Sequence, residues 1–90
     1  MMGTLSPIAR LGDTSDHGGT IISASKVVFA DGIGIARAGD RHSCPRPGHG
    51  VTPLSSDSVH QVEGRWIVRI GDTAGCGAVI TSGSPVSSSE

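Results

Sequence analysis

The amino-acid sequence predicts an all-β fold, and three observations point to it. Valine and isoleucine recur in short runs between glycines and serines, and the chain of 90 residues holds 14 glycines. No run of the sequence repeats apolar residues at helical spacing between capping residues. A phrase with strand-like alternation recurs three times along the chain. Short apolar runs between turn residues are typical of short strands, whereas a disordered linker would be more uniformly polar.

The recurring phrase reads apolar residue, Ala or Val, Arg, any residue, Gly, Asp. Its three copies occupy residues 8–13, 35–40 and 67–72. A second phrase, which begins with His-Gly or Cys-Gly, follows each copy at residues 17–23, 49–55 and 76–82. Ordered copies of one unit indicate a repeat architecture. We therefore expect one compact body with pseudo-threefold symmetry, in which the three His/Cys-Gly turns converge at one end.

Each unit is expected to hold short strands in a fixed order. The first strand carries the arginine phrase, and its alternation is clearest at residues 35–38 and 66–70. The second strand follows the His/Cys-Gly turn, at residues 20–22, around Leu54, and at residues 79–80. The third strand, at residues 27–30 and 59–62, ends in Asp31-Gly32 or Glu63-Gly64. An acidic residue and glycine between apolar runs predict a hairpin, because glycine adopts positive φ at little cost.

The composition excludes several classes of function. The formal net charge is −1 with neutral histidines and no basic block is present, so a nucleic-acid partner is not expected. No stretch approaches the roughly 20 apolar residues of a membrane helix, so stable membrane insertion is not expected either. Residues 1–11 lack the charged start and apolar core of a signal peptide. We therefore expect the protein in the cytoplasm unless a specialised route exports it.

Two cysteines and four histidines indicate a metal site. His17, His49 and Cys76 take equivalent places in the three copies, each before a glycine that lets the backbone turn tightly. Structural zinc takes four thiolate or imidazole ligands in a tetrahedron. The fourth ligand is expected from the extra residues of the middle copy, where His42 and Cys44 compete. A disulfide between the two cysteines is the alternative, although a reducing cytoplasm favours free thiols.

Taken together, these phrases resemble the PAAR-repeat proteins. The likeness is carried by the Pro-Ile-Ala-Arg phrase at residues 7–10, its two later copies, and the His-Gly-Gly, His-x-Cys-Pro-x-Pro-Gly-His-Gly and Cys-Gly-Ala phrases at residues 17–19, 42–50 and 76–78. It covers about residues 7–86, so residues 1–90 are expected to form a single PAAR-repeat domain. The resemblance implies a compact conical body of short strands and hairpins, with a metal ion near its tip.

The resemblance also implies the ion and the ligands. It implies zinc, with iron as the alternative, and a set of three imidazoles and one thiolate. On that ground His42 is preferred over Cys44 as the ligand that completes His17, His49 and Cys76.

The function that the resemblance implies is structural. PAAR-repeat proteins cap the trimeric spike protein VgrG of the type VI secretion system, and we expect one chain on one trimer. The short extensions before Pro7 and after Val86 predict no fused toxin domain, so any effector is expected to bind without a covalent link. The protein is expected in the bacterial cytoplasm before firing, and then at the exterior or in a target cell after export on the spike tip.

Two other functions fit parts of the sequence: a zinc-binding adaptor unrelated to secretion, and a zinc hydrolase, because catalytic zinc has three protein ligands and a water. No carboxylate stands out as a general base, as the Glu of H-E-x-x-H does, which disfavours the hydrolase. The Gly-Asp aspartates are expected to form turns by accepting a backbone N–H two residues on. The arginines of the phrase are expected to be exposed or paired with aspartates between units, and His60 to be solvated.

Overall fold

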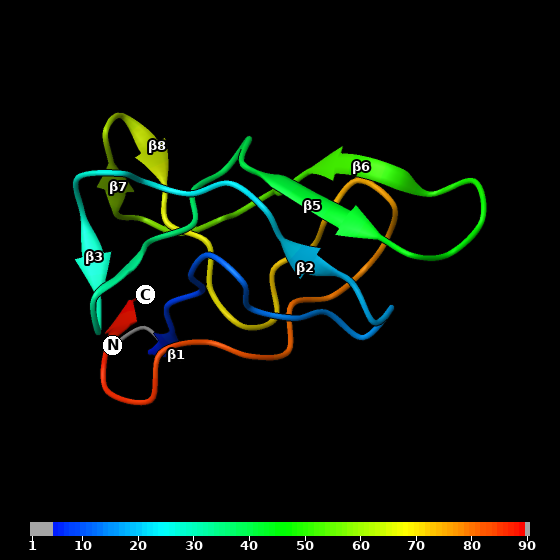
Figure 1. Cartoon of the computed structure of the whole chain (residues 1–90). Helices are drawn as coiled ribbons and strands as arrows, with labels where there is room; N and C mark the ends of the chain where they lie inside the picture. Colours follow the sequence, from blue (N-terminus) through cyan, green and yellow to red (C-terminus); the bar gives the residue numbers. More distant parts are fainter. Residues whose placement is uncertain (1–4, 90) are drawn as a thin grey trace.

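The structure, a computed structural model, describes residues 5–89. Its strands are β1 (Ser6–Pro7), β2 (Thr20–Ile21), β3 (Phe29–Ala30), β4 (Ile33–Gly34), β5 (Arg41–Cys44), β6 (Gly50–Pro53), β7 (Gln61–Val62), β8 (Arg65–Trp66) and β9 (Ser88–Ser89). The all-β prediction is confirmed, and short strands joined by turns make a compact body (Figure 1). In the part of the chain that is described, no helix could cross a membrane. Residues 1–4 and 90 of the expected domain lie outside the described residues.

The strands pair in four small antiparallel sheets. One has three strands in the order β2-β5-β6, and the others are the pairs β3–β4, β7–β8 and β1–β9. The β1–β9 pair joins segments from the two ends of the described chain, with Ser6 opposite Ser89 and Pro7 opposite Ser88. In Figure 1 these three two-stranded pairs lie to the left, and the β5–β6 hairpin extends to the right.

The two predicted Asp-Gly and Glu-Gly hairpins are present. Asp31 and Gly32 connect β3 to β4 with φ values of 56° and 76°, and Glu63 and Gly64 connect β7 to β8 with 55° and 77°. Positive φ at both central residues is the pattern of a type I′ turn, whose twist matches that of the paired strands. The turn residues therefore specify both hairpins locally.

The extra residues of the middle copy form the β5–β6 hairpin. Cys44 pairs with Gly50 at its outer end. Beyond the hairpin, Leu54 takes the place that Ile21 and Ile80 take in the other copies. The N–H of each of these three residues donates to the carbonyl of the aspartate in its own copy, at 2.7, 2.9 and 2.8 Å. The insertion thus leaves the buried strand position unchanged.

The three copies of the arginine phrase contact one another in a closed cycle. The N–H of Ala36 donates to the carbonyl of Ala9, that of Ala9 to Val68, and that of Val68 to Ala36, at 2.9, 2.9 and 3.0 Å. None of these side chains is exposed. Three isolated bridges repeat the cycle: Ile8 with Arg69, Arg10 with Ile35, and Arg37 with Ile67. The small side chains let three backbones approach closely, which is why Ala and Val recur in the phrase.

The apolar core has two clusters of small and branched side chains. One consists of Ala9, Ile21, Ala36, Leu54, Val68, Ala74, Ala78 and Ile80. The other consists of Ile8, Ala30, Ile35, Val62 and Ile67. The second includes residues of the β3–β4 and β7–β8 hairpins, whereas Cys76 packs against the first. The core therefore reaches from the two-stranded pairs to the His/Cys turns.

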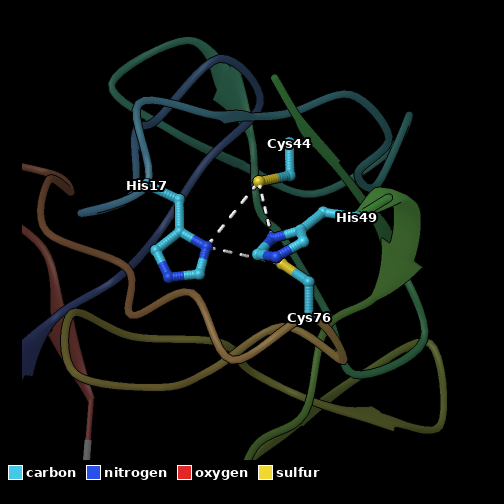
Figure 2. Close-up of side chains that lie close together, drawn as sticks. All are labelled: His17, Cys44, His49 and Cys76. Atoms are coloured by element: carbon cyan, nitrogen blue, oxygen red, sulfur yellow. Dashed lines mark hydrogen bonds between the residues drawn. The ribbon is translucent and has the colours of Figure 1, made fainter. Parts of the chain in front are cut away.

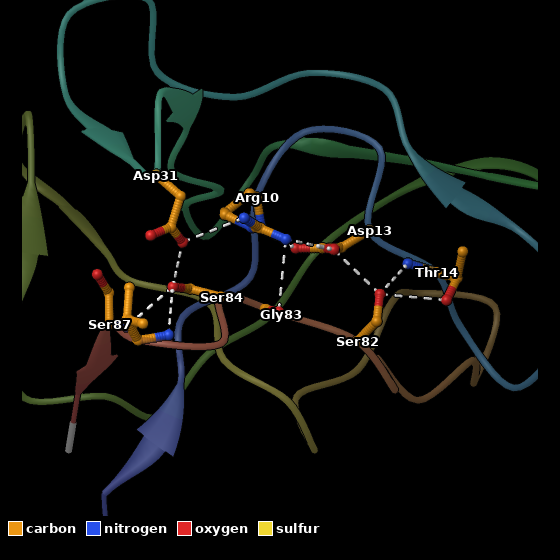
Figure 3. A network of polar contacts seen from close by, with 9 residues as sticks. Arg10, Asp13, Thr14, Asp31, Ser82, Gly83, Ser84 and Ser87 are labelled. Carbon is orange, nitrogen blue, oxygen red and sulfur yellow. Dashed lines mark hydrogen bonds and ion pairs between the residues drawn. The ribbon is translucent and has the colours of Figure 1, made fainter.

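The Gly-Asp aspartates lie in turns, but their carboxylates bond a backbone N–H on the preceding side and not the N–H two residues on that was expected. The reason is that the residues two positions on, Ser15 and Ala74, donate to carbonyls of the following turn. In the three copies the carboxylate accepts the backbone N–H of the arginine three residues earlier, at 2.6, 2.8 and 2.8 Å, and the Nε–H of the same arginine. The arginines are half-buried rather than exposed, and each also contacts a second carboxylate, that of Asp31, Glu63 or Asp57. Figure 3 shows this network in the first copy, where Arg10 lies between Asp13 and Asp31.

Candidate metal centre

Four side chains converge beside the β5–β6 hairpin: His17, Cys44, His49 and Cys76. One nitrogen or sulfur atom from each lies within 4.8 Å of the corresponding atoms of the other three. Figure 2 shows the two sulfurs and the two imidazole rings turned toward a common centre. All three repeat-equivalent residues expected at the site are therefore brought together, and Cys44 is the fourth.

Tight turns and one hairpin position these groups. His17 and Cys76 each precede a glycine with positive φ, 78° at Gly18 and 90° at Gly77, a conformation that glycine adopts easily. Cys44 ends β5, and His49 directly precedes β6. The hairpin thus contributes two of the four clustered side chains from the two ends of one loop, and the other copies contribute one each.

The side chains already contact one another. The Cys44 Sγ lies 3.3 Å from His49 Nδ1 and 3.6 Å from His17 Nδ1, and the Cys76 Sγ lies 3.9 Å from His17 Nδ1. The ring centroids of His17 and His49 are 5.2 Å apart. On its other side, His17 Nε2 lies 3.9 Å from the Asp16 carboxylate. That separation is too long for a hydrogen bond, and the same carboxylate oxygen accepts the Val79 N–H at 2.9 Å.

The structure does not bring His42 into the cluster, contrary to the preference for it as fourth ligand. Its side chain is completely buried, and its Nε2 lies 2.8 Å from the Ser15 hydroxyl. Counted from the aspartate of each copy, His42 matches Ser15 and Ala74, which are also buried. Cys44, counted in the same way, matches His17. The sequence therefore held a signal for Cys44, namely its distance from Asp40.

Cys44 and Cys76 are free thiols, and His60 is exposed and lies outside the cluster. Burial alone would raise the pKa of Cys76, but interactions with the Ala78 N–H, the Thr52 hydroxyl and Cys44 outweigh burial and lower it. A lowered pKa favours the thiolate, which is the form that binds metals.

The donor set suits a structural zinc ion. Two thiolates and two imidazoles form one of the common tetrahedral zinc sets. The atoms already lie close together, and the cluster contains no carboxylate ligand. Thiolate and imidazole donors disfavour calcium and magnesium, which prefer oxygen.

Comparison with known proteins agrees with the geometry. The family model described as "PAAR motif" matches residues 11–82, a span that contains all four residues of the cluster. No curated protein gives a significant match to the chain. The chain belongs to the PAAR-motif family, the spike-tip proteins of the type VI secretion system.

Proposed function

We propose that this protein sharpens and caps the VgrG spike, and that a zinc ion held by His17, Cys44, His49 and Cys76 stiffens its tip. Members of the family are structural tips and not enzymes. The observation that carries the proposal is the cluster of four soft donors inside the span that matches the family.

The need for a metal follows from the shape of the core. Cys76 packs against the first apolar cluster, and beyond it His17, His49 and Cys76 itself are only half-buried. Burial contributes little where so few apolar side chains meet. Metal binding can contribute on the order of 10 kcal/mol to the folding of a small domain. Zinc would therefore stiffen the part of the molecule that the core stabilises least.

A conical, pseudo-threefold body would match a trimeric partner, and we propose it for the single domain of residues 1–90, with the repeat body at about 7–86. Two features support it. The backbone cycle through Ala9, Ala36 and Val68 treats the three copies alike. The bridges Ser15–Ile80, His42–Ile21 and Ala74–Leu54 form a second cycle of the same order, Ile21–His42 lying within the β2–β5 pairing.

The partner would bind at the end that carries the two-stranded pairs. Several of the most exposed apolar side chains belong to these pairs or lie two residues before one of their strands: Val27, Phe29, Val59, Trp66 and Val86, which are 41–77% exposed. Phe29 and Trp66 are the two aromatic residues of the sequence. Exposed aromatic side chains commonly dominate the affinity of an interface. A flat end of three strand pairs would offer one contact to each VgrG protomer.

The test is to mix the protein with its cognate VgrG trimer and measure the mass of the complex by light scattering. We expect one chain per trimer. Phe29→Asp and Trp66→Asp should abolish binding and leave the metal content unchanged. Val51→Asp, at a residue 49% exposed on the β5–β6 hairpin, is the matched control and should bind normally. Three chains per trimer, or no complex, would contradict the proposal.

Delivery by the secretion system follows from the family. We propose that the protein waits in the cytoplasm, leaves on the spike tip, and reaches the exterior or a target cell. Any effector would be held by non-covalent contacts.

A further inference from the structure

Two buried side-chain atoms in residues 5–89 have no hydrogen-bond partner, His42 Nδ1 and Thr52 Oγ1. The two residues are directly opposite each other in the β5–β6 pair. Both side chains lie on the face that also carries Cys44, because residues two apart on a strand share a face. Buried polar atoms without partners are rare in native proteins, so two of them on one cross-strand pair call for a common explanation.

Packing holds the His42 ring in place on one side. Its Nε2 lies 2.8 Å from the Ser15 hydroxyl, and that oxygen also accepts the N–H of Gly19 at 3.2 Å. A Cβ atom at Gly19 would lie 2.6 Å from His42 Nε2, so the backbone closes directly over the ring. The imidazole therefore has little freedom to turn its second nitrogen elsewhere.

On the other side, Thr52 packs against the turn that carries Cys76. A Cβ atom at Gly75 would lie 3.2 Å from the Thr52 Cβ, and the Gly75 N–H donates to the Pro53 carbonyl at 2.9 Å. The Thr52 hydroxyl has no hydrogen-bond partner in the structure. Thr52 thus faces His42 across the strand pair and packs against the residue next to Cys76.

We propose that His42 and Thr52 are positioning residues of the metal centre, joined in a hydrogen-bond chain that ends on the Cys76 sulfur. With the ion bound, Ser15 O–H would donate to His42 Nε2, His42 Nδ1–H to Thr52 Oγ1, and Thr52 O–H to Cys76 Sγ. The first of these contacts is present in the structure, and the other two would form in the loaded site. The Gly19 N–H begins the chain at the Ser15 oxygen. This proposal rests on the proposed metal site, since it concerns the support of one of its ligands.

The groups that can donate and those that can accept set the direction of the hydrogen-bond chain. A metal-bound thiolate has no proton and can only accept. Thr52 must then donate to sulfur, which leaves its oxygen to accept from His42. The imidazole must carry its proton on Nδ1 and accept at Nε2, which matches a donating Ser15 hydroxyl. His42 Nδ1 and Thr52 Oγ1 would each gain a hydrogen-bond partner. A buried polar network in which every group is hydrogen-bonded makes its surroundings rigid.

The decisive variant is Thr52→Val, which removes the hydroxyl and keeps the shape. Supporting groups behind metal ligands are typically worth roughly 10–100-fold in metal affinity. We expect zinc affinity, measured by competition with a chromophoric chelator, to fall by that factor. Thr20→Val is the matched control, because Thr20 is exposed on β2, and should leave the affinity unchanged. An unchanged zinc affinity in Thr52→Val would overturn the proposed hydrogen-bond chain.

A second readout does not depend on affinity. In the zinc-loaded protein, ¹⁵N NMR of the His42 ring should show the neutral tautomer protonated at Nδ1, and Thr52→Val should disturb that signal. A tautomer protonated at Nε2 in the loaded wild type would overturn the proposal. The two proposals can be contradicted separately. If the wild type binds no zinc, both the metal site and the hydrogen-bond chain are wrong. If it binds zinc normally but His42 is protonated at Nε2, only the hydrogen-bond chain is wrong.

Discussion

The Asp40 carboxylate is 3% exposed and yet fully hydrogen-bonded. It accepts the Arg37 N–H at 2.8 Å, the Arg37 Nε–H at 2.9 Å and the Ser23 hydroxyl at 3.0 Å. Burial alone would raise the pKa of Asp40, but the hydrogen bonds from Arg37 and Ser23 outweigh it and hold the pKa below its ordinary value. The same pairing raises the pKa of Arg37. The Arg-x-Gly-Asp spacing thus forms a turn in which the arginine and the aspartate neutralise each other's charge.

Asp40→Asn should lower the free energy of unfolding at neutral pH by about 3 kcal/mol, because it removes the buried negative charge that pairs with Arg37 and Arg65 and leaves Arg37 only the more exposed Glu63. The folded pKa of Asp40 is depressed, so its stabilisation is present above the unfolded pKa of about 3.9 and is lost as the pH falls through the folded pKa. The wild type should therefore lose more stability than the variant between about pH 5 and pH 2. Urea unfolding as a function of pH measures this.

Asp57→Asn is the control for this measurement, since the Asp57 side chain is 91% exposed beside Arg69. It should change stability by less than about 1 kcal/mol. Equal losses in the two variants, or an identical acid limb for Asp40→Asn and wild type, would contradict the role given to Asp40.

Ligand variants separate Cys44 from its neighbour. Cys44→Ser should remove stoichiometric metal, because the sulfur atom faces the centre of the cluster (Figure 2). His42→Gln should keep one metal per chain at lower affinity, because its ring lies outside the cluster. Elemental analysis of the purified proteins gives the ratio, with His60→Ala as the silent control. A Cys44→Ser variant that retains one metal while His42→Gln loses it would restore the original preference for His42.

Single residues also show how far the sequence predicts this site. His17, His49 and Cys76 follow from repetition, because equivalent positions in a repeat occupy equivalent places. The choice between His42 and Cys44 does not follow from alternation, since both side chains face inward. The choice depends on the distance of each residue along β5 from Asp40. It also depends on where the core has room for the imidazole ring of His42. Thr52 carries no sequence signal, because only the pairing register places it beside His42.

At the scale of elements, local turn chemistry was predictable and long-range pairing was not. Asp31-Gly32 and Glu63-Gly64 specify their hairpins through backbone conformation alone. The β1–β9 pair has no such signal, because it joins segments from opposite ends of the described chain. From the sequence, the β5–β6 hairpin is recognisable only as an insertion, because the loop between Cys44 and Gly50 carries the expected metal-site residues and no short hairpin turn. The β1–β9 pairing is a long-range contact, whereas the β5–β6 pairing closes locally between Cys44 and Gly50.

The three two-stranded pairs match in register but not in packing, and Gly34 shows the difference. Gly34 pairs with Phe29, whereas Trp66 takes the corresponding place opposite Gln61. A Cβ atom at Gly34 would lie 2.2 Å from the Ser25 carbonyl oxygen. The Ser25 turn therefore closes over the β3–β4 hairpin so tightly that no side chain fits there.

Gly34→Ala should accordingly cost about 3 kcal/mol, at the upper end for overpacking a close contact. Gly32→Ala should cost only about 1 kcal/mol, because it strains a positive φ in open space. Thermal unfolding of the two variants in parallel gives the order. A smaller loss for Gly34→Ala than for Gly32→Ala would mean that the Ser25 turn yields easily.

At the scale of the whole molecule, the β1–β9 pair completes a ring. Ser88 and Ser89 lie opposite Pro7 and Ser6 as Gln61 and Val62 lie opposite Trp66 and Arg65. The β1–β9 pair thus has the geometry of the two hairpins without their connecting turn. Each copy of the arginine phrase follows the strand of one pair, because residues 8–13 come after β1, residues 35–40 after β4 and residues 67–72 after β8.

A ring of this kind should tolerate circular permutation. We expect a permutant to fold when a glycine joins Glu90 to Ser6, which copies the Glu63-Gly64 turn, and when the chain is opened between Glu63 and Gly64. The new ends lie at an exposed turn, where permutation is best tolerated. The permutant should bind one zinc per chain and keep the far-UV circular dichroism of the parent.

The control is a permutant with the same new connection, opened instead between Asp40 and Arg41. That break separates the buried Asp40 turn from β5, whose inner face carries His42 and Cys44. It should therefore lose both cooperative unfolding and metal binding.

If the two permutants behave alike, the position of the break does not matter, and closure of the ring does not determine the stability of the protein. If the Glu63–Gly64 permutant alone fails, then the β7–β8 turn is essential to folding and the three strand pairs are not interchangeable. Success at Glu63–Gly64 with failure at Asp40–Arg41 is the result that a closed cycle of three units requires, because the cycle depends on the aspartate turns and not on which hairpin is continuous.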